Sequence, residues 1–303
     1  MLAKLEGYAA ALLGSLDRAD LATVASDLST LEQTILGRAD LRAVLTDTSI
    51  AGAARGQVVR DLLSDKLHTS CVRLAVYAAT WTPAQEVPHA VAELAVMAQV
   101  LQEMGTMDQG NLGLMAARKR VGGFADELLD QLETASFAEI EEQLFRWART
   151  IEANPDLRRL LLDRDAPLAA RVGATEQLLS GHVSLETQRL AVYVIVGGRP
   201  RDVVGTLDFL VDYVAVARDW RVARVHTARP LDAASQVQLV DSLTVLTGKD
   251  VELQIAEEPA LLGGVLVEVG DFRLDATTRG RLSELRDAVA SGHLYESSLN
   301  RND

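Results

Sequence analysis

Hydrophobic residues recur at intervals of three and four over the first two thirds of the chain. Ile140, Leu144, Trp147 and Ile151 follow this spacing, which places their side chains on one face of an α-helix. Polar residues fill the positions between them, as expected for the outward face of a helix in a bundle. The pattern predicts short helices packed into bundles, and prolines at positions 83, 88, 167 and 200 fall where these helices are expected to break.

Alternation of apolar and polar residues replaces the helical spacing from about Arg221 onward. Such alternation is typical of strands that bury one face. It occurs at residues 223–226, 251–255 and 265–269, and a segment with helical spacing lies between the first two of these. Asp232 is predicted to cap that helix, because a carboxylate at this position accepts hydrogen bonds from the first free backbone N–H groups.

The sequence "VEVGDFRLDATTRGRL" follows, in which Gly270-Asp271 is predicted to form a tight hairpin turn. Phe272 and Leu274 would continue on the return strand. Asp275 or Thr277 would open a final helix. We summarise this region as a small α/β module with the order β-α-β-β-α.

The pentapeptide RLAVY occurs twice, at Arg73–Tyr77 and Arg189–Tyr193, which are 116 positions apart. When the chain is aligned with itself at that offset, the 38 positions from Asp40 to Tyr77 match without a gap and 16 of them are identical. The helical region is therefore an internal duplication, and each copy is long enough to form a domain. RLAVY is interpreted as packed scaffold in both copies. Asp156 is predicted to cap a helix of the second copy.

These patterns predict a mainly α chain with two tandem homologous helical bundles followed by a small α/β C-terminal domain. The first bundle is expected at residues 1–105 and the second at 123–220, joined by a linker at 106–122 that begins in the Gly-rich, polar sequence "GTMDQGNLG". The C-terminal domain is expected at 221–293, with a polar tail at 294–303.

Composition narrows the classes of function. The formal net charge is −13, so the chain as a whole should repel nucleic acid and anionic lipid. Cys71 is the single cysteine, which rules out an intrachain disulfide, and its apolar neighbours predict a buried, unreactive thiol. No run of about 18 apolar residues is present, so no direct membrane insertion is expected.

Candidate chemistry is sparse. The glycine pairs at 197–198 and 263–264 do not form a phosphate-binding motif. The five histidines are dispersed without metal-ligand spacing, and no Ser/His/Asp arrangement is recognisable. The sequence predicts no catalytic residue, no metal site and no cofactor.

The C-terminal region "ALLGGVLVEVGDFRLDATTRGRLSEL" resembles the corresponding segment of the ATP synthase δ subunit (OSCP/δ) family. The opening "YAAAL" and the elements "DLRAVLTD" and "DLRRLLLD" are also similar to elements of that family's helical domain. Ala276-Thr277 stands where the family usually has Gly-Ser. A duplicated helical domain is a pattern of actinobacterial relatives. The residues that occupy the family's C-terminal motif positions are Leu262, Gly263, Gly264, Gly270, Asp271, Asp275, Leu282 and Leu285.

The resemblance implies a non-catalytic peripheral-stalk (stator) subunit of proton-translocating ATP synthase. In that family the helical domain binds N-terminal helices of α subunits on the catalytic head, and the C-terminal module binds the b stalk. The location implied is the cytoplasmic face of the inner (plasma) membrane, as a peripheral protein. By family analogy the first and fifth helices of a bundle form the α groove, which points to Tyr8, Leu12 and Leu13 in the first copy and Phe124, Leu128 and Leu129 in the second.

Alternatives remain at this point. The same fold could serve as a helical adaptor of another complex, or the α/β module could carry an enzyme site, although no convergent polar residues support one. Some actinobacterial relatives are fused to a membrane-anchored b-type segment. The chain is thus either a free-standing duplicated δ or a piece of a longer b–δ fusion.

Overall fold

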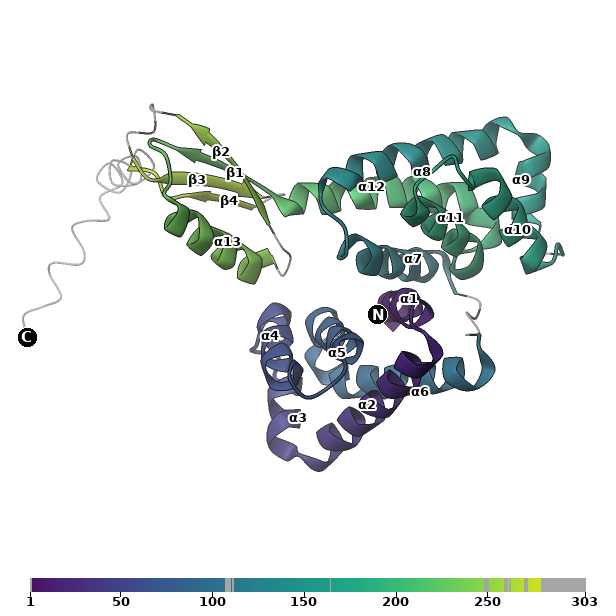
Figure 1. Cartoon of the computed structure of the whole chain (residues 1–303), viewed down its shortest axis with the longest axis horizontal. Helices are drawn as coiled ribbons and strands as arrows, with labels where there is room; N and C mark the ends of the chain where they lie inside the picture. The colour runs from purple at the N-terminus through teal and green to yellow at the C-terminus, as the bar shows by residue number, and fades with distance from the viewer. Residues whose placement is uncertain are drawn as a thin grey trace, which may run out of the picture. The chain divides into compact units, whose positions relative to one another are not determined.

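The structure is a computed structural model that describes residues 2–106, 110, 112–163, 165–247, 251–258, 261, 263–269 and 272–278 (Figure 1). The chain divides into two compact units, Met1–Ala215 and Val216–Asp303. Helices dominate the first unit and a small sheet forms the second. The predicted mainly α class is confirmed.

The first unit contains two series of helices in the same order. We call α1–α6 the first copy and α7–α12 the second copy. The first comprises α1 (Leu2–Gly14), α2 (Arg18–Gly37), α3 (Ala39–Thr46), α4 (Gly52–Leu63), α5 (Thr69–Trp81), the 3-10 turn η1 (Ala84–Glu86) and α6 (Val87–Met104). The second comprises α7 (Leu114–Leu129), α8 (Ala135–Ala153), α9 (Pro155–Leu162), α10 (Leu168–Leu179), α11 (Leu185–Gly197), η2 (Pro200–Asp202) and α12 (Val203–Arg221).

The offset found in the sequence also relates the helix bounds. Each of α9, α10, α11 and η2 begins and ends 116 residues after its counterpart α3, α4, α5 or η1. The core follows the predicted apolar face: Ile140, Leu144, Trp147 and Ile151 are all buried. The prediction of a buried, unreactive thiol agrees with the structure. Cys71 is fully buried, and burial raises its pKa to about 12.

Two local predictions need correction. The cap of α9 is Asn154, whose side-chain oxygen accepts the backbone N–H of Leu157 at 3.2 Å, so Asp156 lies inside the first turn. Pro155 at the first helical position explains the shift, because proline favours that position. The predicted linker at 106–122 is too long, since α7 already begins at Leu114.

The second unit is built on a four-stranded sheet. Its elements are β1 (Val222–Thr227), α13 (Ala233–Thr247), β2 (Glu252–Glu257), β3 (Val265–Val269) and β4 (Phe272–Asp275). The strand order is β2-β1-β3-β4, with β1 and β2 parallel and the other neighbours antiparallel. The crossover between the parallel strands runs through α13, as such a connection requires. The order β-α-β-β-α counts one strand too few, because the return strand β4 is separate.

In this unit, the helix cap and the buried strand residues are those predicted from the sequence. Asp232 Oδ1 accepts the backbone N–H of Ser235 at 2.7 Å, as predicted. Alternate residues of β1 and β3, including Val225 and Val267, are fully buried beside Leu243 of α13. The predicted hairpin turn Gly270-Asp271 and the final helix lie outside the described residues, although Val269 and Phe272 pair across the strands that flank the turn.

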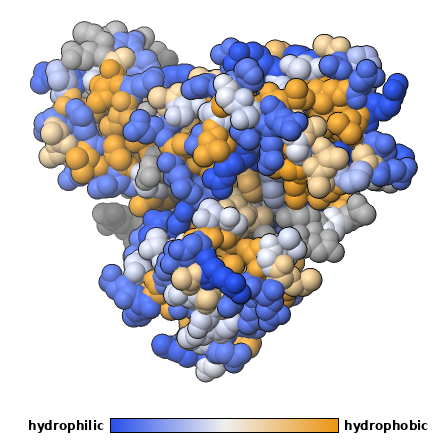
Figure 2. Space-filling model, turned by 45° about the vertical axis from the view of Figure 1, so that its right-hand side comes forward, coloured by the Kyte–Doolittle hydropathy of each residue, from blue (hydrophilic) through white to orange (hydrophobic). Residues whose placement is uncertain are grey.

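The surface mixes hydrophobic patches with hydrophilic residues (Figure 2). Large apolar side chains that remain exposed include Leu62, Trp81, Phe145 and Leu185. In the described part of the chain, no helix combines the length and apolar character needed to cross a bilayer.

Candidate functional site

The six groove residues inferred from family resemblance all lie inside the first unit. Tyr8, Leu12, Leu13, Phe124, Leu128 and Leu129 are each at most 8% exposed. Tyr8 stacks on Tyr77 of α5, and Phe124 stacks on Tyr193 of α11, with 3.8 Å between ring centroids in both pairs. These two stacks are equivalent under the 116-residue offset. The six residues therefore occupy matching interior positions, and their part in binding an α helix stays a prediction.

The helices that carry these residues, α1 and α7, lie side by side (Figure 1). They meet at two glycines that occupy equivalent positions, Gly7 and Gly123. A Cβ atom on Gly7 would overlap the carbonyl oxygen of Arg120, and one on Gly123 would overlap that of Lys4. Lys4 and Arg120 are again equivalent positions. The crossing is thus isologous, the kind of contact that two identical subunits make across a two-fold axis.

Polar groups around the crossing form a buried network. Asp126 of α7 accepts hydrogen bonds at 2.6 Å from the hydroxyls of Tyr77 and Tyr213, and pairs with the Lys4 ammonium at 2.9 Å. The ammonium also lies 4.0 Å from the ring centroid of Trp81, within range of a cation–π interaction. Burial, followed by the Asp126 charge, raises the pKa of Tyr77 and Tyr213 well above 10. Both phenols stay neutral donors at physiological pH.

Glu127 is the second buried acid of α7. Its side chain is fully buried, and one carboxylate oxygen lies 3.4 Å from the guanidinium of Arg73 in α5. The other oxygen has no hydrogen-bond partner. Burial raises the pKa of Glu127, and the charges of Arg73 and Arg189 oppose that rise. Arg73 and Arg189 are the arginines of the two RLAVY segments, so the pentapeptide carries charge to this contact as well as packing its leucines.

One pattern in the sequence points to this contact, namely the glycines at equivalent positions 7 and 123. A glycine inside a helix costs about 1 kcal/mol relative to alanine, so a glycine kept at the same position of both copies suggests close backbone approach. Asp126 and Glu127 gave no such signal, because acids on a helix are usually solvated.

A second feature is a largely apolar cavity of about 430 Å³ in the first copy, lined by residues of α2, α3, α4, α5 and α6. Leu31, Ile35 and Leu62 are among its apolar lining residues, and Lys66 is among its polar ones. The position equivalent to Leu31 in the second copy is Trp147, a larger side chain that is buried there. The volume is in the range of ligand pockets, but the lining offers few polar groups to orient a reactant.

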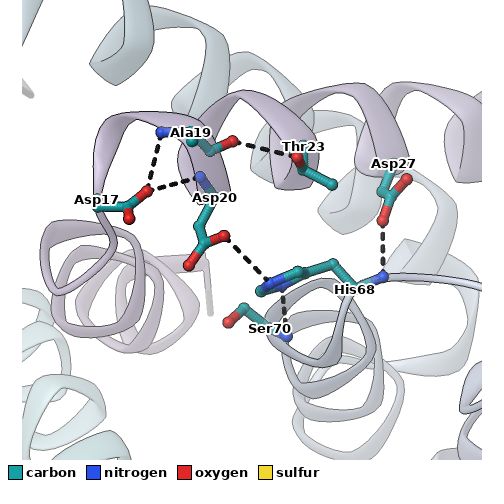
Figure 3. Close-up of polar contacts among 7 residues, drawn as sticks. All are labelled: Asp17, Ala19, Asp20, Thr23, Asp27, His68 and Ser70. Carbon is teal, nitrogen blue, oxygen red and sulfur yellow. Dashed lines mark hydrogen bonds and ion pairs between the residues drawn. The ribbon is translucent and has the colours of Figure 1, made fainter.

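A third feature is the polar cluster at the N-terminus of α5 (Figure 3). His68 caps this helix: its Nδ1 accepts the backbone N–H of Ser70 at 3.2 Å. The backbone N–H of His68 donates to Asp27 of α2 at 2.7 Å, and its Nε2 lies 3.8 Å from Asp20. These contacts join the N-terminal end of α5 to α2, which is a structural task. Among the described residues, no three His, Cys, Asp or Glu side chains are arranged to hold a metal ion.

In the second unit, the described motif residues are structural. Gly264 has a φ of +78°, and a Cβ there would overlap the carbonyl oxygen of Ala276, so only glycine fits. Asp275 Oδ1 accepts from the Thr277 backbone N–H at 3.0 Å and from its hydroxyl at 2.6 Å, and these bonds lower the pKa of Asp275. Of the other predicted motif positions, Leu262, Gly270, Asp271, Leu282 and Leu285 lie outside the described residues.

The sequence of the chain is similar to those of known proteins. The model of the family "ATP synthase delta (OSCP) subunit" matches residues 125–289, which covers most of the second copy and most of the C-terminal unit. The ATP synthase subunit delta of Kineococcus radiotolerans is 32% identical over 278 residues, 91% of each chain. The Streptomyces avermitilis protein of the same name is 29% identical over 90% of each chain, and the Nocardia farcinica protein is 30% identical over 94% of this chain and 95% of its own.

An alignment over nine tenths of the chain necessarily includes most of both copies, so the match extends to the duplication. The chain belongs to the ATP synthase delta (OSCP) subunit family, whose members are structural rather than catalytic subunits.

Proposed function

We propose that this chain is a non-catalytic peripheral-stalk subunit of a proton-translocating ATP synthase. The observation that carries the proposal is its similarity, over about nine tenths of both chains, to proteins named ATP synthase subunit delta. The subunit would act as a stator: it would hold the catalytic head against the turning rotor, so that rotation drives ATP synthesis.

The finer proposal concerns its two attachments. One end would bind N-terminal helices of α subunits on the head, and the other would bind the b-type stalk at the cytoplasmic face of the membrane. Two compact units in one chain support this division, because a connector needs two separate adhesive surfaces. Helix-in-groove docking would serve the α contact.

The physical demand on such a connector is mechanical rather than chemical. It needs interfaces that resist torque, and it needs no reactive group. The buried ionisable side chains described above fit that demand, because they join helices to one another.

The test is a reconstitution. Membranes stripped of this subunit and of the catalytic head would receive purified head with or without the full chain, and proton-driven ATP synthesis would be measured. We expect coupled synthesis only when the chain is present, with ATP hydrolysis by the free head unchanged. Equal synthesis with and without the chain would overturn the proposal.

The alternative is a helical adaptor of another complex. Affinity purification of the tagged full chain from its native membranes separates the two, with a tagged unrelated helical protein as control. Recovery of α, β and b subunits in stoichiometric amounts supports the stalk subunit, and recovery of a different complex without them supports the adaptor.

A further inference from the structure

The contact between the two copies is symmetric in its backbone and asymmetric in its charges. Gly7 and Gly123 are equivalent and each admits the other helix. The positions equivalent to Asp126 and Glu127, by contrast, are Ala10 and Ala11. Helix α7 therefore brings two acids that have no counterpart in α1, whereas the acid that α1 brings is Glu6, which lies 3.8 Å from Arg120 of α7.

The first copy presents the matching partners on one face. Lys4 of α1 pairs with Asp126, and α5 supplies the Tyr77 hydroxyl to Asp126 and the Arg73 guanidinium to Glu127. This α1–α5 face, defined by Lys4, Gly7, Arg73 and Tyr77, thus offers α7 a glycine for close approach and two cations for its acids. A helix with a glycine followed three and four residues later by acids fits that chemistry, and α7 is such a helix.

Both acids of α7 are buried at this contact. The side chains of Asp126 and Glu127 are 5% and 0% exposed, although acids are almost never fully buried unless they are paired. The cations that pair with them are partly exposed at their outer edge, at 24% for Lys4 and 32% for Arg73. The acids of α7 thus pair with cations of the first copy and anchor α7 to it, while Asp126 also accepts a hydrogen bond from Tyr213 of its own copy.

We propose that α7 is the resident occupant of the α1–α5 face, so that the second copy serves the first as a built-in helical ligand. This gives the extra copy a role of its own and does not depend on the proposed function. If the proposed function also holds, an α-subunit helix meets an α1–α5 face that is already filled.

The tether makes this occupancy hard to displace. The helices α6 and α7 are separated by only residues 105–113, and a short linker gives a tethered group an effective concentration on the order of millimolar. A free helix at micromolar concentration would therefore need about 10³-fold higher intrinsic affinity to replace α7.

The test uses the full chain and a labelled peptide with the sequence of α7, residues 114–129. In the variant Gly123→Leu, the new side chain would collide with the α1 backbone at Lys4, so α7 of the chain should leave the face while the first copy keeps its own sequence. We expect fluorescence anisotropy to show at least about tenfold tighter peptide binding to this variant than to the wild type.

The matched control is Gly173→Leu, in α10 of the same copy, where an added Cβ meets nothing within 4 Å. It should bind the peptide as poorly as the wild type does. A peptide that itself carries Gly123→Leu should not bind any of the chains. Equal binding of the wild-type peptide to all three chains, or binding to none while circular dichroism shows retained helix, would overturn the proposal.

Should Gly123→Leu fail to fold, the double variant Asp126→Ala with Glu127→Ala takes its place. It gives α7 the residues that α1 has at the equivalent positions and removes both anchors without steric conflict. The expectation is the same gain in peptide binding, and the same absence of gain would refute it.

Discussion

The first and second copies share a helical scaffold but solve the same local problems with different residues. At the start of the fifth helix, the first copy uses a His68 cap whose backbone N–H donates to Asp27. The second copy uses Ser184 at the equivalent position, with its backbone N–H donated to Gln143 at 2.9 Å. Both members of the pair have changed and the hydrogen-bond pattern has not, which indicates that the duplication preserved geometry rather than residues.

The fourth and fifth helices show a case where the geometry did change. In the first copy, Gly52 and Gly56 lie against Thr80 of α5, and an added Cβ on either would overlap it. The equivalent positions in the second copy are Leu168 and Val172. Larger side chains keep the two helices further apart. This difference affects the hydrogen bonds of a buried arginine that both copies share.

Arg55 fills the narrow contact of the first copy. Its guanidinium donates to the carbonyl oxygens of Ile50, Ala79 and Thr82 at 2.6, 3.2 and 3.0 Å. Arg171, at the equivalent position, is just as buried, yet its Nε and Nη1 have no hydrogen-bond partner. The contact of the second copy thus leaves two donor groups of this buried cation without acceptors.

The largest change in the free energy of unfolding is expected when these two arginines are replaced. Arg55→Leu should lower the free energy of unfolding by about 3 kcal/mol, because three buried carbonyls lose a charged donor. Arg171→Leu should change it by less than about 1 kcal/mol or raise it, because it removes a buried charge without acceptors. Urea unfolding of the full chain measures both, and equal losses would contradict the comparison.

The next effect concerns the helix spacing. Gly52→Ala should destabilise the chain by about 2 kcal/mol, since the new methyl would press on the Thr80 backbone. The matched control Gly173→Ala lies in a helix with open space around the site and should stabilise by about 0.5–1 kcal/mol through helix propensity. The sign of the difference, read from thermal unfolding, decides whether Gly52 is needed for close packing.

The third prediction uses the acid that only the second copy carries. The pKa of Glu127 is higher in the folded chain than in the unfolded one, so the folded state binds the proton more tightly. Its contribution to stability is therefore complete below the unfolded pKa, near 4.5, and is lost as pH rises through the folded value. Glu127→Gln removes this loss, so the stability of the variant relative to the wild type should increase as pH is raised from 4 to 7.

Urea titrations at several pH values measure the trend. Glu142→Gln serves as the control, because this acid of α8 is largely exposed and pairs only with Arg146 along the same helix. If the unfolding free energy of Glu127→Gln relative to the wild type does not change with pH, as expected for the control, then folding does not alter the pKa of the buried carboxylate.

The smallest effect on stability is expected when the helix cap of the first copy and the acceptor of its backbone N–H are replaced by those of the second copy. His68→Ser together with Asp27→Gln gives the first copy the cap and acceptor of the second. We expect a change in unfolding free energy within about 0.5 kcal/mol for the pair. The single change His68→Ser should differ from it by a measurable coupling in a double-mutant cycle. A loss above about 2 kcal/mol for the pair would mean that the two caps are not interchangeable.

Much of the fold could be predicted because it depends on local periodicity. The apolar face around Leu144 and the alternation around Val267 are read from residues close together in the sequence. The 116-residue offset found in the sequence also relates the observed bounds of α9, α10 and α11 to those of their counterparts. Errors arose where two local signals compete, as at Asn154 and Asp156, both of which are good caps beside Pro155.

The contact between the copies could not be predicted in the same way. Tyr8, Leu12 and Phe124 form apolar stripes, but a stripe does not show which helix covers it. Family resemblance assigned these positions to an external partner, and that assignment stays a prediction. The packing of α1 against α7 is a separate contact that these apolar stripes do not indicate. The partners of Asp126 come from α1, α5 and α12, which are far apart along the chain, so no window of sequence contains the network.

The glycine crossing of α1 and α7 also has a consequence for biosynthesis. Helix α1 ends at Gly14, but the helix that packs on it is complete only at Leu129. At about 5–20 residues per second of synthesis, α1 would wait roughly 6–23 s for this neighbour to be made. During that interval the Gly7 face of α1 has no α7 to cover it, so it is open to other nascent chains until α7 has been made.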